Sequence, residues 1–509
     1  MFAKISSLGL FGLNAFPVDV EIDISRGMPQ FSIGGLPDIV VKESRDRIRS
    51  ALRACDIKFP VANVTINLAP ASTRKSGSVH DMAILMAVLS AMQMIDKSTE
   101  NCAFIGELSL NGDFRYINGV LPMVILAREK GIKSVFVPYD NAHEASAIQG
   151  INIYAVKNTE ELILHFRNIQ NMTPCEHYIP PEAAYNDTLD FADVKGQQSA
   201  KKALEIAAAG GHNALLIGTP GSGKSMLAKR MPSILPPLSF EEALETTNIH
   251  SISGLLSPQN PIMTRRPFRS PHHTISSAGL AGGGSIPQPG EVSLAHNGLL
   301  FLDELAEFDR RTLEILRQPL EDGEVTISRS SGTATYPCKI MLIGAMNPCP
   351  CGYFGHPKVK CTCSGRKISD YLSKVSGPLL DRFDLHIEAA PVEFKDLASN
   401  GKEETSAEIR RRVIDARKIQ AERFKGTSIT CNAFITDDKI NTMCPMDSSA
   451  ESIMQNVIDN LGLSARAYSK ILKVARTIAD LDHSDIIKRK HLAAAAQYRS
   501  LDRKYWNEH

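Results

Sequence analysis

The sequence predicts an α/β protein with two α/β units followed by a helical unit, and three observations support this prediction. Apolar and polar residues alternate with the period of strands in several runs of the first 170 residues. A short apolar run, a glycine-rich loop and a helix-forming stretch follow one another at residues 214–229. From residue 396 onward the apolar spacing is that of helices. A chain of 509 residues is also too long for one hydrophobic core, so several domains are expected.

The first unit, residues 1–170, is predicted to be a compact α/β domain. Apolar residues alternate with acidic ones over Val18–Ile24, which predicts a half-buried strand. A helix is expected to start at Pro37 and Asp38, with its apolar side formed by Ile39, Val40, Ile48, Ala51 and Leu52. An apolar helix is predicted over residues 82–94, and further strands and helices alternate after it.

The remaining boundaries follow from changes in composition. Three prolines and several polar residues without a period predict a linker at residues 171–187. Strands and helices alternate again over residues 188–395, the second α/β unit. Residues 396–509 are predicted to be mostly helical, with Ile409 and Val413 on one helix face.

Composition excludes several classes of protein. Hydrophobic residues make up 43% and charged residues 22%, as in ordinary globular proteins, and no run of apolar residues is long enough to span a membrane. Polar residues and a proline follow the start too early for a signal peptide, so a cytoplasmic location is expected. Ten cysteines in such a chain indicate reduced thiols or a metal site. The net charge of +1 means that any nucleic-acid contact must be concentrated on one surface.

A phosphate-binding loop is predicted after the apolar run at residues 214–217. It has the pattern G-x-x-x-x-G-K-S between a strand and a helix, in which backbone N–H groups converge on phosphate oxygens. Lys224 is expected to neutralise the β- and γ-phosphates of ATP, and the Ser225 hydroxyl to bind Mg²⁺. The predicted ATP-binding residues of this loop are Gly218, Thr219, Pro220, Gly221, Ser222, Gly223, Lys224 and Ser225.

Two further apolar runs end in polar residues suited to ATP hydrolysis. Asp303 and Glu304 follow a run of four apolar residues, at the strand end where ligands of open α/β sheets collect. Asp303 is expected to reach Mg²⁺, with Ser225, and Glu304 to polarise the attacking water. Asn347 ends the next apolar run, where it can orient that water or sense the γ-phosphate.

Two arginines complete the predicted catalytic set. Arg382 lies in the stretch Leu-Leu-Asp-Arg-Phe-Asp, and an arginine supplied to a neighbouring subunit would stabilise charge on the transferring phosphate. Arg466 opens a helix of the last unit, from which it can reach the γ-phosphate.

Four cysteines form two close pairs, Cys349 with Cys351 and Cys361 with Cys363. Four thiolates can bind one Zn²⁺ tetrahedrally, which predicts a zinc-binding loop over residues 349–363. The spacing within each pair is tighter than in most zinc sites. His356 replacing one ligand and a reduced loop without metal are the alternatives.

Two segments are predicted to contact DNA phosphates. Residues 324–336 are expected to form a hairpin with Arg329 and Ser330 near its tip, just before the run that ends in Asn347. The second segment is an insertion that contains Arg265, Arg266, Arg269 and the glycine-rich stretch 281–284. Cationic and hydroxyl groups at loop tips suit sequence-independent phosphate contacts. The alternative is that the arginines of the insertion contact the nucleotide or a neighbouring subunit.

In their order along the chain, these motifs resemble the magnesium-chelatase-like AAA+ ATPases, and the stretch Asn-Pro-Cys-Pro-Cys-Gly is similar to that of the YifB/ComM group. The resemblance covers nearly the whole chain. It implies an AAA+ P-loop core with a parallel sheet over residues 188–395 and a C-terminal helical lid. It also implies a ring, expected to be a hexamer, with ATP and Mg²⁺ between neighbours and Arg382 acting across the interface.

The N-terminal domain resembles the Lon-type protease domain at Lys75–Asp81 and at Gly106–Leu108. The resemblance places the serine nucleophile of that family at Val79 and its lysine base at Leu121. Ser78 is one position away, where its hydroxyl would point elsewhere. Without a nucleophile and a base in contact, acyl transfer has no mechanism, so a non-catalytic Lon-like domain is expected.

The family resemblance implies an ATP-dependent DNA translocase or helicase. Its partners would be single-stranded and branched or duplex DNA, and it would promote branch migration during natural transformation. One alternative is the motor subunit of a magnesium chelatase, which would require separate partner subunits. Another is a protein remodeller, but the aromatic and glycine pore loop of unfoldases is not evident in the sequence.

Overall fold

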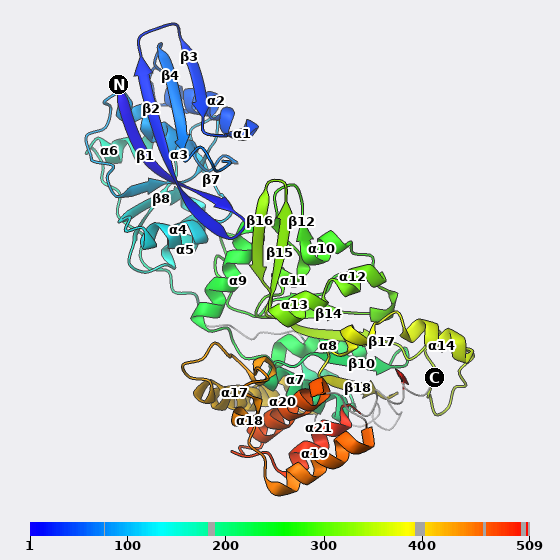
Figure 1. Ribbon diagram of the computed structural model, residues 1–509. Helices are drawn as coiled ribbons and strands as arrows, with labels where there is room; N and C mark the ends of the chain where they lie inside the picture. The colour runs from blue at the N-terminus through cyan, green and yellow to red at the C-terminus, as the bar shows by residue number, and fades with distance from the viewer. Residues whose placement is uncertain (76, 182–188, 392–402, 462–464, 500–504, 507–509) are drawn as a thin grey trace.

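The computed structural model describes residues 1–75, 77–181, 189–391, 403–461, 465–499 and 505–506. An N-terminal α/β domain, a second α/β domain and a helical C-terminal region follow one another through the molecule (Figure 1). This is the predicted α/β class with a helical end. Within the described residues, no helix combines the length and the apolar character that a bilayer span requires.

The N-terminal domain is built on a seven-stranded mixed sheet in the order β3-β4-β2-β1-β5-β8-β9. Its strands are β1 (Phe2–Phe11), β2 (Asn14–Ser25), β3 (Gln30–Gly34), β4 (Asn63–Ala69), β5 (Cys102–Phe104), β8 (Ser134–Pro138) and β9 (Asn152–Val156). A separate two-stranded ladder joins β6 (Glu107–Leu108) to β7 (Phe114–Arg115). The alternation in β2 is observed as predicted, because Val18, Val20 and Ile22 are all buried.

Six helices accompany this sheet: α1 (Ile39–Lys42), α2 (Ser44–Ala54), α3 (Asp81–Ala91), α4 (Val120–Glu129), α5 (Ala142–Ser146) and α6 (Thr159–Phe166). The helix expected from Pro37 is two helices that meet at Glu43. The predicted buried side is confirmed in the second, where Ile48, Ala51 and Leu52 are buried, and was wrong in the first. Ile39 is 75% exposed and Val40 40%, whereas Val41 is buried. The interruption at Glu43 separates a first piece with exposed apolar residues from a second with a buried apolar side.

The described part of the predicted linker lies on the N-terminal domain. The backbone N–H of Cys175 donates to the carbonyl of Ile153 in β9 at 2.7 Å, and that of Tyr178 donates to Ser146 at 3.1 Å. Residues 182–188 of the linker lie outside the described residues.

The second domain contains a parallel five-stranded sheet in the order β11-β14-β17-β10-β18. Its strands are β10 (Ala214–Gly218), β11 (Phe268–Arg269), β14 (Leu299–Leu302), β17 (Met341–Met346) and β18 (Leu385–Ala389). Because the strands are parallel, their carboxyl ends meet at one edge, where β10, β14 and β17 deliver the predicted nucleotide-binding residues.

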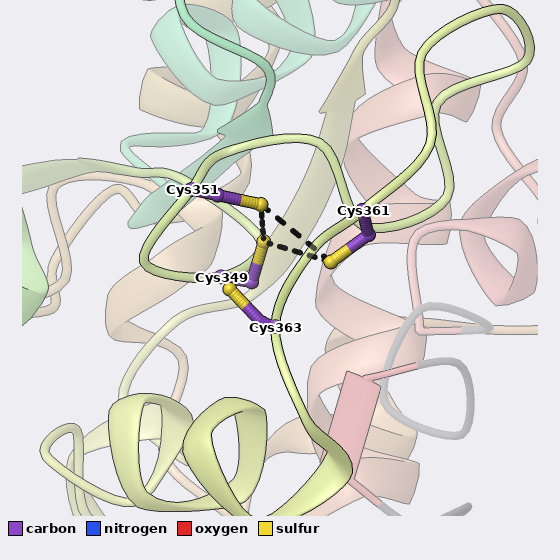
Figure 2. A group of neighbouring side chains, drawn as sticks. All are labelled: Cys349, Cys351, Cys361 and Cys363. Carbon is purple, nitrogen blue, oxygen red and sulfur yellow. Dashed lines mark hydrogen bonds between the residues drawn. The ribbon is translucent and has the colours of Figure 1, made fainter.

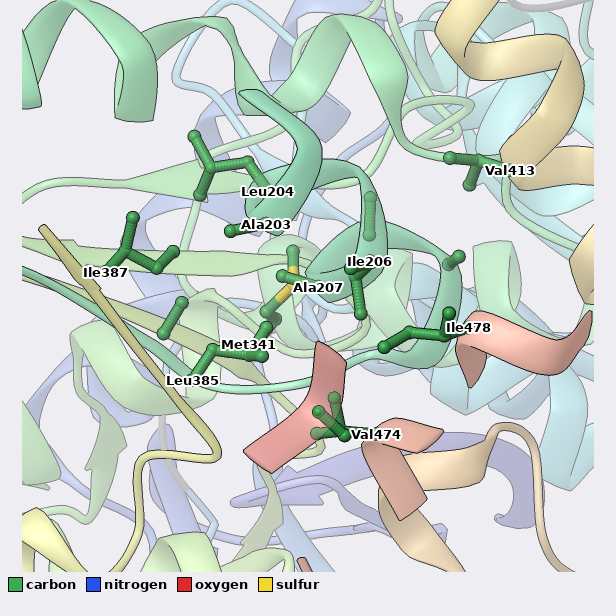
Figure 3. Packing of buried hydrophobic residues seen from close by; sticks show 14 of the residues in the cluster. Ala203, Leu204, Ile206, Ala207, Met341, Leu385, Ile387, Val413, Val474 and Ile478 are labelled. Atoms are coloured by element: carbon green, nitrogen blue, oxygen red, sulfur yellow. The ribbon is translucent and has the colours of Figure 1, made fainter. Parts of the chain in front are cut away.

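The three central strands β14, β17 and β10 are buried on both faces, which explains why they are continuous apolar runs. In β10, Leu216 packs into one cluster with α7 (Gln198–Gly210), while Leu215 packs into another on the opposite face. The first cluster also includes Val413 and Val474 of the C-terminal helices (Figure 3). One core therefore joins the second domain to the helical region.

Short helices and two hairpins complete the second domain. The helices are α8 (Lys224–Ile234), α9 (Phe240–Ile252), α10 (Ser277–Ala281), α11 (Glu291–Leu294), α12 (Arg310–Glu314), α13 (Arg317–Asp322), α14 (Gly365–Leu372) and α15 (Gly377–Leu380). One hairpin pairs β12 (Gly282–Gly283) with β13 (Gln288–Pro289), and the other pairs β15 (Glu324–Arg329) with β16 (Gly332–Pro337). The second is the hairpin that the sequence predicts, with Arg329 opposite Gly332 beside the turn.

The C-terminal region is helical as predicted. Its helices are α17 (Ser406–Arg423), α18 (Ile440–Met443), α19 (Ser448–Leu461), α20 (Ala465–Leu481) and α21 (Arg489–Gln497). A capping box starts α17, in which Thr405 and Glu408 satisfy each other's backbone N–H groups. Ile409, Val413 and Ala416 then form its buried stripe.

The N-terminal domain contacts the second domain at two places. At the first, the N–H of Gly119 donates to Ser251 Oγ of α9 at 3.0 Å, and that hydroxyl donates to the buried carboxylate of Glu144. Burial raises the pKa of Glu144. At the second, the turn between β1 and β2 reaches β16, where a Cβ on Gly12 would lie 2.7 Å from that of Ala334. The backbone at Gly12 lies so close to Ala334 that a residue with a side chain would not fit at position 12.

Candidate nucleotide site

The predicted phosphate-binding loop has the geometry that its glycines allow. Gly221 and Gly223 have φ values of +76° and +85°, which residues with a Cβ rarely adopt. A Cβ on Gly218 would lie 2.4 Å from the carbonyl oxygen of Ala389, so this position also excludes a side chain. The loop leads from β10 into α8, and an N-terminal helix end next to such a loop favours bound phosphate.

Lys224 lies at the start of α8 with 9% of its surface exposed. Its Nζ donates to the carbonyls of Gly218 and Thr219 at 2.7 and 2.9 Å, and to Asn347 Oδ1 at 3.2 Å. Burial lowers its pKa to about 8, while the charge of Asp303 acts in the opposite direction. The structure therefore brings together the predicted phosphate-binding lysine and the predicted sensing asparagine.

The two predicted Mg²⁺ ligands are also adjacent. Ser225 Oγ donates to Asp303 Oδ2 at 2.6 Å, across the space between α8 and the end of β14. A hydroxyl and a carboxylate oxygen beside a phosphate-binding loop are the donor set that Mg²⁺–nucleotide sites use. The residues present thus fit a Mg²⁺ ion, which Ser225 and Asp303 would hold and which would neutralise phosphate charge.

Glu304 follows Asp303 in an unusual backbone conformation. Its φ of +53° is in the left-handed region, and its side chain is 60% exposed. The carboxylate lies 3.3 Å from His273 Nδ1, in the insertion that precedes β14. Such strain in a non-glycine residue clusters at functional sites. His273 was missed as a site residue, because the sequence only placed it in a segment predicted to contact DNA.

The two predicted arginines lie away from these residues. Arg382 follows α15, where its guanidinium donates to the carboxylate of Glu321 in α13 and its side chain is only 13% exposed. This ion pair within the chain was not predicted. Arg466 is in the first turn of α20 with an exposed side chain. In the described part of the chain, no hydrogen bond joins either arginine to Lys224 or Asp303.

The arginines of the two segments predicted to contact DNA have different surroundings. Arg266 donates to both carboxylate oxygens of Glu242 at 3.2 and 2.7 Å, and Arg269 to both of Glu291 at 2.6 and 2.7 Å. These two arginines are held in bidentate ion pairs inside the chain. Arg329, by contrast, is exposed at the end of β15.

The glycine-rich stretch and the Arg329 hairpin lie side by side. Ser331 Oγ donates to the carbonyl of Ser285 at 2.6 Å, and the buried Tyr336 hydroxyl donates to that of Pro287 at 2.8 Å. The two hairpins therefore form one surface with Arg329 at its edge.

The four cysteines of the predicted zinc loop converge (Figure 2). The sulfur of Cys349 lies 3.4 Å from that of Cys351 and 3.7 Å from that of Cys361, and the sulfurs of Cys351 and Cys361 are 3.5 Å apart. All four sulfurs lie within 4.8 Å of one another. Tetrahedral Zn²⁺ with Zn–S bonds of about 2.3 Å separates its sulfurs by about 3.8 Å, so the cluster is compatible with zinc. His356 is not a member of this cluster; its Nδ1 accepts from the N–H groups of Lys358 and Val359.

The structure shows the surroundings of the two positions to which the expected Lon-type resemblance assigns a catalytic pair. Leu121 is fully buried in α4 and Val79 is partly buried. The Ser78 hydroxyl donates to the Glu107 carboxylate. A carboxylate can accept that proton, but the lysine base of the Lon-type dyad is replaced by leucine, so this geometry gives no reason to revise the expected non-catalytic role.

Comparison with known proteins places this geometry in a family. Three family models match the chain: "Magnesium chelatase, subunit ChlI" at residues 190–397, "Subunit ChlI of Mg-chelatase" at 20–141, and "Magnesium chelatase, subunit ChlI C-terminal" at 403–499. Competence protein ComM of Haemophilus influenzae is 42% identical over 508 residues, which cover 98% of each chain. YifB of Escherichia coli is 42% identical over 496 residues, 97% of this chain and 96% of the relative.

The similarity to a chelatase subunit is more limited. The magnesium-chelatase 67 kDa subunit of Chlorobaculum parvum is 29% identical over 164 residues, 31% of this chain and 23% of that protein. The two relatives above instead match over 97–98% of this chain. The chain belongs to the magnesium-chelatase-like AAA+ ATPases, in the group that contains ComM and YifB.

Proposed function

We propose that this chain forms a ring, a hexamer, that hydrolyses ATP between neighbouring subunits and moves along DNA. The proposal extends to branch migration of DNA during its integration in natural transformation. It rests on three supports: the nucleotide-site geometry, the exposed Arg329 hairpin, and full-length similarity to a protein whose name includes competence.

In this proposal each predicted site residue has one role in ATP hydrolysis. Lys224 and the loop N–H groups bind the phosphates, and Ser225 with Asp303 holds Mg²⁺, which supplies charge neutralisation when bound. Glu304 accepts the proton of the attacking water and Asn347 orients that water. Arg382 of a neighbouring subunit stabilises the transferring phosphate, and Arg466 reaches the γ-phosphate from the lid.

The connection between β16 and β17 carries the DNA part of the proposal. β16 ends at Pro337 and β17 begins at Met341, so the hairpin leads directly into the strand that ends beside Asn347. Asn347 in turn contacts Lys224. A shift of Asn347 on ATP hydrolysis is thereby transmitted along β17 to the residues that would bind DNA, Arg329 and Ser330.

We expect Arg329→Ala to weaken DNA binding and to remove DNA stimulation of ATP hydrolysis, while basal hydrolysis remains. Loss of one phosphate contact lowers the slope of log K against log salt by about 0.9 for each subunit engaged. The measurement is DNA binding by fluorescence anisotropy at several salt concentrations, with single-stranded, duplex and branched DNA, alongside an ATPase assay. Arg310→Ala, at an exposed arginine of α12, is the control for loss of charge alone.

Two results of this experiment would decide against the proposal. Normal DNA binding with lost basal hydrolysis would place Arg329 at a nucleotide interface instead. The absence of any DNA binding or DNA stimulation in the unmodified protein would favour the alternative, a chelatase-type motor. That alternative is supported by the chelatase family models, and it requires partner subunits.

We also propose that the four-cysteine cluster binds structural Zn²⁺. Purified full-length protein should contain about one Zn²⁺ per chain, since four thiolates saturate a tetrahedral site. Replacing Cys349 and Cys361 with serine should remove it. Elemental analysis of protein kept reduced and free of chelators measures the stoichiometry, and a content near zero would favour the metal-free loop.

A further inference from the structure

The four-cysteine loop lies directly against the phosphate-binding loop. Gly352 follows the first cysteine pair with a φ of +83°, and its N–H donates to the carbonyl of Cys349 at 2.9 Å. A Cβ built on Gly352 would lie 2.4 Å from Pro220 Cδ and 2.6 Å from Pro220 Cγ. The backbone of the cysteine loop therefore packs on the proline ring, with no space for a side chain between them.

The same loop is tied to the nucleotide site at its beginning. Cys349 is fully buried and comes two residues after Asn347, whose side chain accepts from Lys224. The backbone of Asn347 is also hydrogen-bonded to the side chain of the buried Tyr371. Tyr371 is in α14, the helix that follows the second cysteine pair. The loop thus contacts the nucleotide site at two positions, Pro220 and Asn347.

Between its two ends the loop has little structure of its own. Residues 349–363 contain turns and bends but neither a helix nor a strand. The sulfur cluster is where the two ends of the loop come together, since it joins Cys351 to Cys361 ten residues later. A bound cation would cross-link these ends and fix the position of Gly352 between them.

We propose that metal binding at the four cysteines controls the affinity of the nucleotide site. Zn²⁺ at Cys349, Cys351, Cys361 and Cys363 holds Gly352 against Pro220 and so keeps the phosphate-binding loop in its ATP-binding shape. Loss of the metal releases this contact and weakens ATP binding. The inference rests on the proposed nucleotide and zinc sites, and adds a regulatory link between them.

The test compares full-length protein loaded with Zn²⁺ and the same protein after treatment with a chelator. Bound Zn²⁺ is measured by elemental analysis, and the Kd for a fluorescent, non-hydrolysable ATP analogue by titration. We expect removal of Zn²⁺ to raise this Kd at least about tenfold. The Cys361→Ser and Cys363→Ser double variant should behave like the metal-free protein. Cys55→Ser with Cys102→Ser, in the N-terminal domain, is the control for loss of two cysteines.

A second variant separates the contact from the metal. Gly352→Ala keeps all four cysteines but places a methyl group against Pro220, so we expect normal Zn²⁺ content and a raised Kd. Gly426→Ala is its matched control, because Gly426 has a similar φ of +80° and no atom within 4 Å of the added Cβ. The comparison of Gly352→Ala with Gly426→Ala remains informative even if the metal-free protein unfolds, because both variants keep all four cysteines.

A different result would contradict each of the three proposals: the zinc site, the nucleotide site and the control of nucleotide affinity by the metal. Protein that binds the ATP analogue but no Zn²⁺ contradicts the zinc site. Protein that binds Zn²⁺ but no nucleotide in any form contradicts the nucleotide site. An unchanged Kd in both the metal-free protein and the Gly352→Ala variant overturns the control proposed here, and leaves the two sites themselves in place.

Discussion

Glu304→Gln is expected to bind ATP with unchanged affinity and to hydrolyse it at least about 100 times more slowly. The substitution removes the carboxylate that we propose accepts a proton from water. It keeps Lys224, Ser225 and Asp303, whose contacts with one another do not include the Glu304 side chain. Titration with a fluorescent ATP analogue measures binding, and a steady-state phosphate-release assay measures turnover.

Glu307→Gln is the matched control for this variant. Glu307 is an acidic residue three positions later that pairs with Lys374 at the surface, and its substitution should leave turnover unchanged. Lys224→Ala should differ from both, because it removes a phosphate contact and weakens binding itself. Turnover at the unmodified rate in Glu304→Gln would mean that another residue activates the water, and His273 would be the first to test.

Arg382→Ala and Lys224→Ala should each abolish activity alone and recover part of it when mixed. An arginine that acts on a neighbour's ATP contributes about 10³-fold or more to hydrolysis. In a mixed ring, the intact arginine of a Lys224→Ala subunit can meet the intact pocket of an Arg382→Ala subunit. Random mixing in equal amounts leaves about one quarter of the interfaces complete, because each interface joins two different surfaces. The measurement is ATPase rate against mixing ratio.

The ion pair between Arg382 and Glu321 calls for a control. Glu321→Gln breaks that pair but keeps the arginine, so it should retain activity if Arg382 works across the interface. If Arg382 serves mainly to hold α13 in place, Glu321→Gln will lose activity too and the mixture will not recover. A monomer that hydrolyses ATP at the full rate would also contradict the role across the interface.

The parts of the fold that were predictable are those whose cause is local. The strands of the second domain are apolar on both faces, so β10, β14 and β17 could be located as short apolar runs. The phosphate-binding loop could be located because its glycines and lysine must occur at fixed spacing. The adjacency of Ser225 and Asp303 was expected from the rule that parallel strands end at one edge.

The parts that were not predictable depend on residues far apart in the chain. His273 meets Glu304 only because the insertion folds back over the end of β14, and no local pattern indicates where an insertion returns. Arg266 and Arg269 were predicted to contact DNA phosphates, but each forms an ion pair within the chain, Arg266 with Glu242 and Arg269 with Glu291. These partners are also distant in sequence. The break between α1 and α2 was missed because a four-residue helix has too few positions to show a period.

The turn between β1 and β2 joins the N-terminal domain to the hairpin of the second domain. Gly12 of this turn packs on Ala334, and a Cβ on Gly332 would lie 2.5 Å from the ring of Phe11, so the turn touches the hairpin that ends in Arg329. β1 continues from that contact to the middle of the seven-stranded sheet (Figure 1). A displacement of the hairpin that contains Arg329 would therefore act directly on β1, the central strand of the N-terminal sheet.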